Sequence, residues 1–135
     1  MPKKHTRRAA AVTALGAVLY PALEVLWRGY SHISMALAGA AACLLLYYLN
    51  VLFAAWSRPA RAAAGGALIL LIEFIIGVIC NLFLGLGVWD YSSKPFNLLG
   101  QVCPAFALLW LGLSYLFAWL VERVENEERE MMQIS

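Results

Sequence analysis

Four long apolar runs constrain the fold of this chain more than any other feature. They extend over residues 9–27, 33–56, 65–89 and 102–121. A helix needs about 20 predominantly apolar residues to cross the hydrocarbon core of a bilayer, and each run has about that length. Of the 135 residues, 63% are hydrophobic and 13% are charged, which is too apolar for a soluble domain of this size. The sequence therefore predicts an all-α integral membrane four-helix bundle.

The ends of the runs support this division. Gly29 and Pro59, which commonly end helices, follow the first and second runs. Four of the five tryptophans lie at the expected end of a different run: Trp27, Trp56, Trp89 and Trp119. An indole prefers the headgroup level of a bilayer, so these positions mark the expected membrane boundaries.

The basic residues indicate the orientation of the bundle. With a cytoplasmic N-terminus, eight of the ten fall on the inner side: Lys3, Lys4, Arg7, Arg8, Arg58, Arg61, Arg123 and Arg129. Only Arg28 and Lys94 would then face outward. The positive-inside rule therefore predicts two outward helical hairpins with both termini cytoplasmic. Residues 1–8 would form a basic cytoplasmic N-terminus, residues 9–121 the transmembrane domain and residues 122–135 an acidic cytoplasmic tail.

The acidic tail is expected to continue the fourth helix for a turn or two. Glu125 and Arg129 have the i,i+4 spacing of a weak helical ion pair. Acidic side chains near a helix C-terminus oppose the macrodipole, so the end should fray. The tail is interpreted either as a solvated segment or as a docking site for a cytoplasmic partner.

The third run carries polar and small residues at a regular spacing. Glu73, Gly77, Asn81 and Gly85 recur every four residues, so they would form one stripe along a helix. A small, polar stripe is typical of a face that packs against another helix or lines a cavity. Both interpretations stay open for the two glycines and for Asn81.

Glu73 is the least expected of these residues. An isolated charge in hydrocarbon costs several kcal/mol, so this carboxyl group must be protonated, paired or exposed to water. Asn50, in the second run, has a similar expected depth and could be its partner. We expect Glu73 to be a protonatable group that faces an internal cavity with an aqueous pocket or proton relay.

A second polar group is expected where the first and third runs end. Its members are Glu24, Arg28, His32, Asp90, Tyr91, Asn97 and Gln101. Glu24 lies one turn before Arg28, so the two can pair. Arg28 and Asp90 occupy matching places in the two hairpins and have opposite charges, which predicts a cross-link. This group either clamps the hairpins together or recognises a ligand, and Gly100 belongs to the irregular loop that supports it.

Several classes of function lack any signature. The sequence has no glycine-rich phosphate loop, GxSxG or HExxH, so we do not expect an enzyme. His5 and His32 are far apart, and the three cysteines have no metal-binding spacing, so no metal or other cofactor is expected. The basic residues form no aromatic, positively charged surface for nucleic acid.

Three segments together resemble a known family. They are WRGYSHISM (residues 27–35), EFIIGVICN (residues 73–81) and WDYSSKPFNLLGQVC (residues 89–103). They resemble the bacterial membrane proteins called putative ABC-transporter type IV, or CmpB-type, which are similar to the animal transmembrane protein 229 group. The matching positions are Arg28, Gly29, His32, Glu73, Gly77, Asn81, Trp89, Asp90, Tyr91, Asn97, Gly100 and Gln101. The resemblance implies a multi-pass protein of the bacterial inner membrane with a transport role.

The leading functional expectation is a permease-like component that binds or moves a small solute. Four short spans leave little room for a pathway within one chain, so we expect a homo-oligomer or a partner membrane subunit. The alternative is a non-transporting scaffold or assembly subunit, in which the polar residues only pack helices together. The residues do not identify a substrate, a coupling ion or an ATPase partner.

Overall fold

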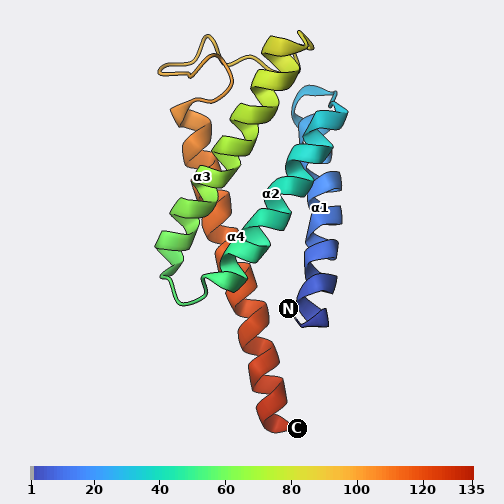
Figure 1. Cartoon of the computed structure of the whole chain (residues 1–135), viewed down its shortest axis with the longest axis vertical. Coiled ribbons are helices and arrows are strands. Elements are labelled where there is room, and N and C mark those ends of the chain that lie inside the picture. The colour runs from blue at the N-terminus through green and yellow to red at the C-terminus, as the bar shows by residue number, and fades with distance from the viewer. Residues whose placement is uncertain (1) are drawn as a thin grey trace.

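The computed structural model describes residues 2–135 and is all-helical over that range, without a β-strand. Its elements are α1 (Lys3–Arg28), α2 (Ile33–Leu52), α3 (Arg58–Gly77), the π-helical segment η1 (Val78–Phe83) and α4 (Pro104–Ile134) (Figure 1). Four helical stretches are long and apolar enough to cross a membrane: α1, α2, α3 together with η1, and α4. The chain is therefore a multi-pass membrane protein, as the four apolar runs predict.

The third helical stretch begins and ends earlier than the sequence predicts. It covers residues 58–83 instead of 65–89, because Ser57 caps α3 by accepting a hydrogen bond from the Ala60 N–H at 3.3 Å. Pro59 lies in the first helical turn, where its missing N–H costs nothing, so it starts a helix instead of ending one. Gly85 has a φ of 65°, in the left-handed region, and lies beyond the helix. Gly85 is therefore not part of the Glu73 stripe.

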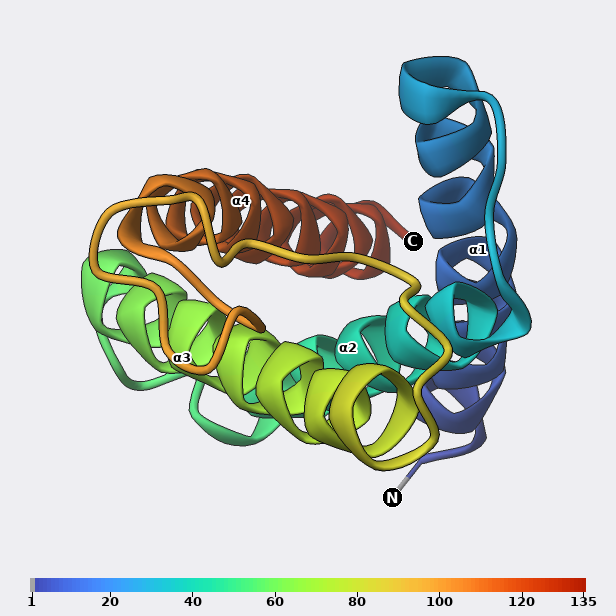
Figure 2. The ribbon, with the colours of Figure 1, turned by 90° about the horizontal axis from the view of Figure 1, so that it is seen from above.

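Small residues bring the helices together in pairs. α1 packs along α2, where Gly16 and Gly39 face each other so closely that a β-carbon on either would collide with the other's carbonyl. α3 packs along α4, where Gly65 lies against the side chain of Ser114. Such close approach is how helices gain contact in lipid, where no hydrophobic effect drives them together. α2 also contacts α3 and α4, so it joins the two pairs (Figure 2).

The bundle has two chemically different ends. Both chain termini lie toward one end, called the terminal end here, and the long loop of residues 84–103 lies at the other, the loop end (Figure 1). α4 projects beyond the other helices at the terminal end and is helical to Ile134. The prediction that the acidic tail prolongs the helix by only a turn or two is therefore wrong.

The basic start of the chain pairs with the acidic tail. Residues of the expected N-terminal extension form the first turns of α1, so their side chains reach α4. Arg8 bonds to Glu125 at 2.6 Å and also pairs with Glu128, which Lys4 binds at 3.0 Å. Glu125 on α4 is thus paired with Arg8 on α1, and the predicted Glu125–Arg129 pair is not formed. The tail is held by ion pairs that connect the first and last helices.

Candidate functional site

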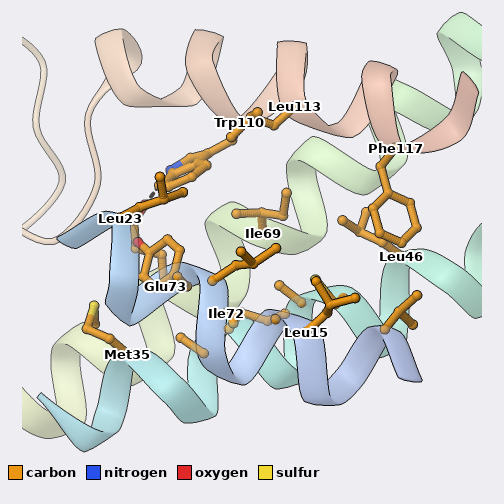
Figure 3. A pocket seen from close by; sticks show the side chains of 18 of the residues that line it. Leu15, Leu23, Met35, Leu46, Ile69, Ile72, Glu73, Trp110, Leu113 and Phe117 are labelled. Carbon is orange, nitrogen blue, oxygen red and sulfur yellow. Dashed lines mark hydrogen bonds between the residues drawn. The ribbon is translucent and has the colours of Figure 1, made fainter. Parts of the chain in front are cut away.

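Glu73 lies on α3, where only 6% of its surface is exposed. Its Oε2 accepts a hydrogen bond from the Trp110 indole N–H at 3.0 Å (Figure 3). Its Oε1 accepts one from the Tyr91 hydroxyl at 3.3 Å. Burial, followed by the charge of Glu73, raises the pKa of Tyr91, so the phenol stays protonated and donates. Two neutral donors, from α4 and from the long loop, therefore hold this carboxyl group.

No basic side chain neutralises Glu73. Among residues 2–135, the ion pairs lie at the terminal end or join Glu24 to Arg28, and none includes Glu73. A carboxylate has about four lone-pair positions and here accepts two hydrogen bonds. The group therefore keeps acceptor capacity and lacks a counter-charge.

The predicted partnership between Asn50 and Glu73 is wrong. Asn50 accepts a hydrogen bond from Arg61 at 2.9 Å and donates to the Leu46 carbonyl at 2.8 Å. α2 ends at Leu52, not at residue 56, so Asn50 lies near the terminal end of its helix. Glu73 is 15 residues, or about 22 Å, from the start of α3 at that same end.

A cavity of ≈ 410 Å³ lies beside Glu73. All four helices contribute to its wall, which includes Leu15, Leu46, Ile69, Leu113 and Phe117 (Figure 3). Glu73 is the one carboxylate on this wall, next to the rings of Tyr20, Trp89 and Trp110. Cavities with apolar walls stay free of water, so this chemistry does not fit the expected aqueous pocket. The arrangement instead suits an apolar body with one polar group.

The long loop closes the loop end of the bundle. Val88 and Trp89 of this loop are buried, and the Trp89 indole N–H donates to the Gln101 backbone carbonyl at 3.0 Å. Asn81 donates to the Gln101 side chain at 2.8 Å and accepts from the Val88 N–H at 2.6 Å. A β-carbon at Gly77 would lie 2.6 Å from the Gln101 Oε1, so only glycine allows this approach. Both the packing role of Gly77 and the bonding of Asn81 agree with the packing interpretation of the stripe.

The predicted cross-link between Arg28 and Asp90 is also wrong. Arg28 lies 2.5 Å from Glu24, as their spacing predicts, and its Nη1 donates to the Val88 carbonyl at 2.7 Å. Asp90 is exposed, and its carboxylate accepts a hydrogen bond from the Ser92 N–H at 2.9 Å. Hydrogen bonding to Ser92 lowers the pKa of Asp90, which stays an exposed carboxylate. Arg28 thus joins α1 to the loop through a backbone oxygen.

The remaining residues of the predicted polar group shape the backbone. His32 caps α2 by accepting from the Ser34 N–H at 3.1 Å, and Asn97 accepts from the Gly100 N–H at 2.9 Å. Gly29 and Gly100 have φ values of 82° and 71°, which favour glycine. These contacts are local, one at the start of α2 and one within the long loop, and ligand recognition by this group stays a prediction.

Sequence reasoning missed Trp110 and Arg61 as the partners of Glu73 and Asn50. Trp110 was recognisable as the one tryptophan far from an expected membrane boundary, which is a signal for an internal hydrogen-bond acceptor. Arg61 is 3% exposed and pairs with Glu122, which Arg58 also binds at 2.8 Å. His5, in the expected basic N-terminus, is buried and hydrogen-bonded to the Tyr47 hydroxyl at 2.9 Å.

Comparison with known proteins adds one finding. The family model described as "Putative ABC-transporter type IV" (ABC_trans_CmpB) matches residues 35–134. The matched range includes Glu73, Tyr91 and Trp110, but Arg28, Gly29 and His32 lie outside it. No curated protein and no solved structure matches the chain significantly. Similarity to the transmembrane protein 229 group stays a prediction.

Proposed function

Because the chain belongs to the family described as "Putative ABC-transporter type IV", we propose that it is a permease-like membrane component that binds and moves a small solute. The observation that carries the proposal is the cavity of ≈ 410 Å³ with Glu73 on its wall. Ligand sites in proteins are typically concave, mostly apolar and about 300–1,000 Å³ in volume, with a few placed polar groups. The cavity has each of these properties, so we assign solute binding to it and the role of polar anchor to Glu73.

The proposed orientation has both termini in the cytoplasm of a bacterial cell and the protein in the inner membrane. Eight of the ten lysines and arginines belong to the terminal end, whereas Arg28 and Lys94 belong to the loop end. The positive-inside rule favours this placement of the two helical hairpins. Cytoplasmic labelling of a cysteine introduced at Ser93, in a chain whose native cysteines are replaced, would contradict it.

Movement of the solute requires more than one chain in this proposal. The long loop covers the loop end with Val88 and Trp89, and the cavity formed by the described residues has mostly apolar walls. A second copy or a partner membrane subunit would supply the other wall of a pathway. We assign no catalytic step to this chain, so any ATP hydrolysis would belong to a partner.

One observation favours a different function. Both oxygens of Glu73 are hydrogen-bonded, to Trp110 and to Tyr91, as they would be in a purely structural role. In that case the chain would be a scaffold or assembly subunit, and Glu73 would tie α3 to α4 and to the long loop. The two functions differ in whether any solute stabilises the isolated protein.

Ligand-induced thermal stabilisation of the purified full chain tests the proposal. A solute at 100 times its Kd should add about 2.7 kcal/mol of stability, which raises the melting temperature by several degrees. Glu73→Gln should reduce the shift, whereas Glu127→Gln, which changes an exposed carboxylate, should not. A panel of apolar and amphiphilic solutes that produces no shift in the unaltered chain would favour the scaffold function.

A further inference from the structure

The cavity combines features that indicate the charge of its ligand. Glu73 is almost fully buried, lies on the cavity wall and has no basic partner within the described chain. Tyr20 and Trp110 line the same part of the cavity with ring centroids 5.8 Å apart, and Trp89 lines it as well. Aromatic faces attract ammonium groups, and the attraction grows when water is excluded. A carboxylate and three aromatic rings around one apolar space form a site for a cation.

We propose that the cavity binds a lipophilic cation, a molecule with one ammonium group and an alkyl or aromatic body. This inference rests on the proposed function and specifies its solute. The ammonium group lies beside Glu73 and the rings of Tyr20 and Trp110, and it donates to the free lone pairs of the carboxylate. The body lies among the apolar side chains toward the terminal end, including Leu46 and Phe117.

The size of the cavity fits such a molecule. On α4 the wall extends from Trp110 to Leu120, a rise of about 15 Å along the helix. The polar atoms of Glu73 and Trp110 lie at one end of this length, and Leu46 and Phe117 lie at the other (Figure 3). A single-chain amphiphile has the same asymmetry, with one polar end and one apolar end.

The ligand enters from the lipid, between α1 and α4. Leu15 on α1 and Leu116 on α4 both line the cavity, and they remain 52% and 49% exposed. The cavity is therefore open at the side of the bundle, whereas Val88 and Trp89 cover it at the loop end. A lipid acyl chain can fill this opening but has no group that neutralises Glu73. An ammonium ion supplies a counter-charge for an ionised Glu73, which is why we favour it as the occupant.

The test compares two ligands that differ only in their polar group, decylammonium and decanol. The full chain is placed in lipid nanodiscs, and binding is measured by isothermal titration calorimetry, with empty nanodiscs as the correction for partitioning. Decylammonium should bind once per chain and at least about tenfold more tightly than decanol, because a hydrogen bond to a charged group is stronger than one between neutral groups.

Four variants test the location of the site. Glu73→Gln should weaken decylammonium binding about ten- to hundredfold and remove the preference over decanol. Glu73→Asp keeps the charge and should keep the preference, even where it lowers stability. Glu127→Gln, on an exposed part of α4, should leave both affinities unchanged. Ile69→Phe places extra volume inside the cavity and should weaken both ligands.

The outcomes separate this inference from the proposed function. Equal affinities for decylammonium and decanol, both lowered by Ile69→Phe, would overturn the cation assignment and leave solute binding in the cavity standing. A preference for decylammonium that Glu73→Gln does not change would also overturn the assignment. If neither ligand binds above the empty nanodiscs, both this inference and binding of apolar solutes in the cavity are wrong.

Discussion

Glu73 and Trp110 form the contact on which the interior of the bundle depends. The indole N–H of Trp110 reaches the carboxyl oxygen from a different helix, 37 residues away in sequence. In an apolar interior neither group has water as an alternative partner, so losing one leaves the other unsatisfied. The pair therefore has a structural role whether or not a ligand occupies the cavity.

Trp110→Phe should show the strength of this contact. The change keeps an aromatic ring in place but removes the N–H, so Glu73 retains only the Tyr91 donor. We expect a loss of about 1–3 kcal/mol in the free energy of unfolding, measured by denaturant titration in mixed micelles. Trp119→Phe, at a partly exposed position of the same helix, is the matched control. Equal losses in the two variants would contradict the role given to Trp110.

At the scale of elements, the long loop is attached to α3 through the residues around η1. Asn81 in η1 binds both the Gln101 side chain and the Val88 backbone, and Gly77 allows Gln101 and Trp89 to approach. A π-helical segment has a wider turn than an α-helix and commonly occurs at functional sites. Here the segment and the glycine position the loop that supplies Tyr91 to Glu73.

Gly77→Ala should therefore displace the loop. The added β-carbon would lie 2.6 Å from the Gln101 Oε1 and 2.8 Å from the Trp89 ring, which is overpacking that costs about 1–3 kcal/mol. Gly112→Ala on α4 is the control, because a β-carbon there meets nothing within 4 Å and should stabilise the helix by up to about 1 kcal/mol. Chymotrypsin should cleave after the exposed Phe96 of the loop faster in Gly77→Ala than in Gly112→Ala. Equal cleavage rates would show that Gly77 does not hold the loop.

At the scale of the whole molecule, ion pairs at the terminal end connect the helices around the cavity. Lys4 and Arg8 on α1 bind Glu125 and Glu128 on α4, mostly through partly exposed side chains. Arg58 and Arg61 on α3 form a second cluster with Glu122 on α4. This cluster is more buried, because Arg61 is 3% exposed and depends on Glu122 for its counter-charge. The two clusters should therefore contribute unequally to stability.

Neutralising one acid from each cluster measures this difference. Glu122→Gln leaves the buried Arg61 without a counter-charge and should lower the free energy of unfolding by at least about 2 kcal/mol. Glu128→Gln removes a partly exposed partner and should cost clearly less than Glu122→Gln, and less still at high salt. Unfolding in micelles at low and high ionic strength provides both values. A larger effect of Glu128→Gln would reverse the assigned importance of the clusters.

Local patterns predicted a large share of this molecule. The four helices follow from the lengths of the apolar runs, and the pair of Glu24 with Arg28 follows from one-turn spacing on one helix. Glu73 is identifiable as an exception because a carboxylate is costly in a run of apolar residues. Each of these conclusions depends only on neighbours in sequence and on lipid as the solvent.

Only the tertiary structure decided which distant groups meet. Asn50 binds Arg61 instead of Glu73, because α2 ends and α3 begins earlier than the apolar runs suggest. Trp110 reaches Glu73 because small residues let α3 and α4 approach each other. Which faces of the two helices meet is not encoded in either apolar run alone. The sequence thus determined how many helices form and which residues are chemically unusual. Packing in three dimensions determined their partners and placed a cavity with mostly apolar walls beside the buried acid.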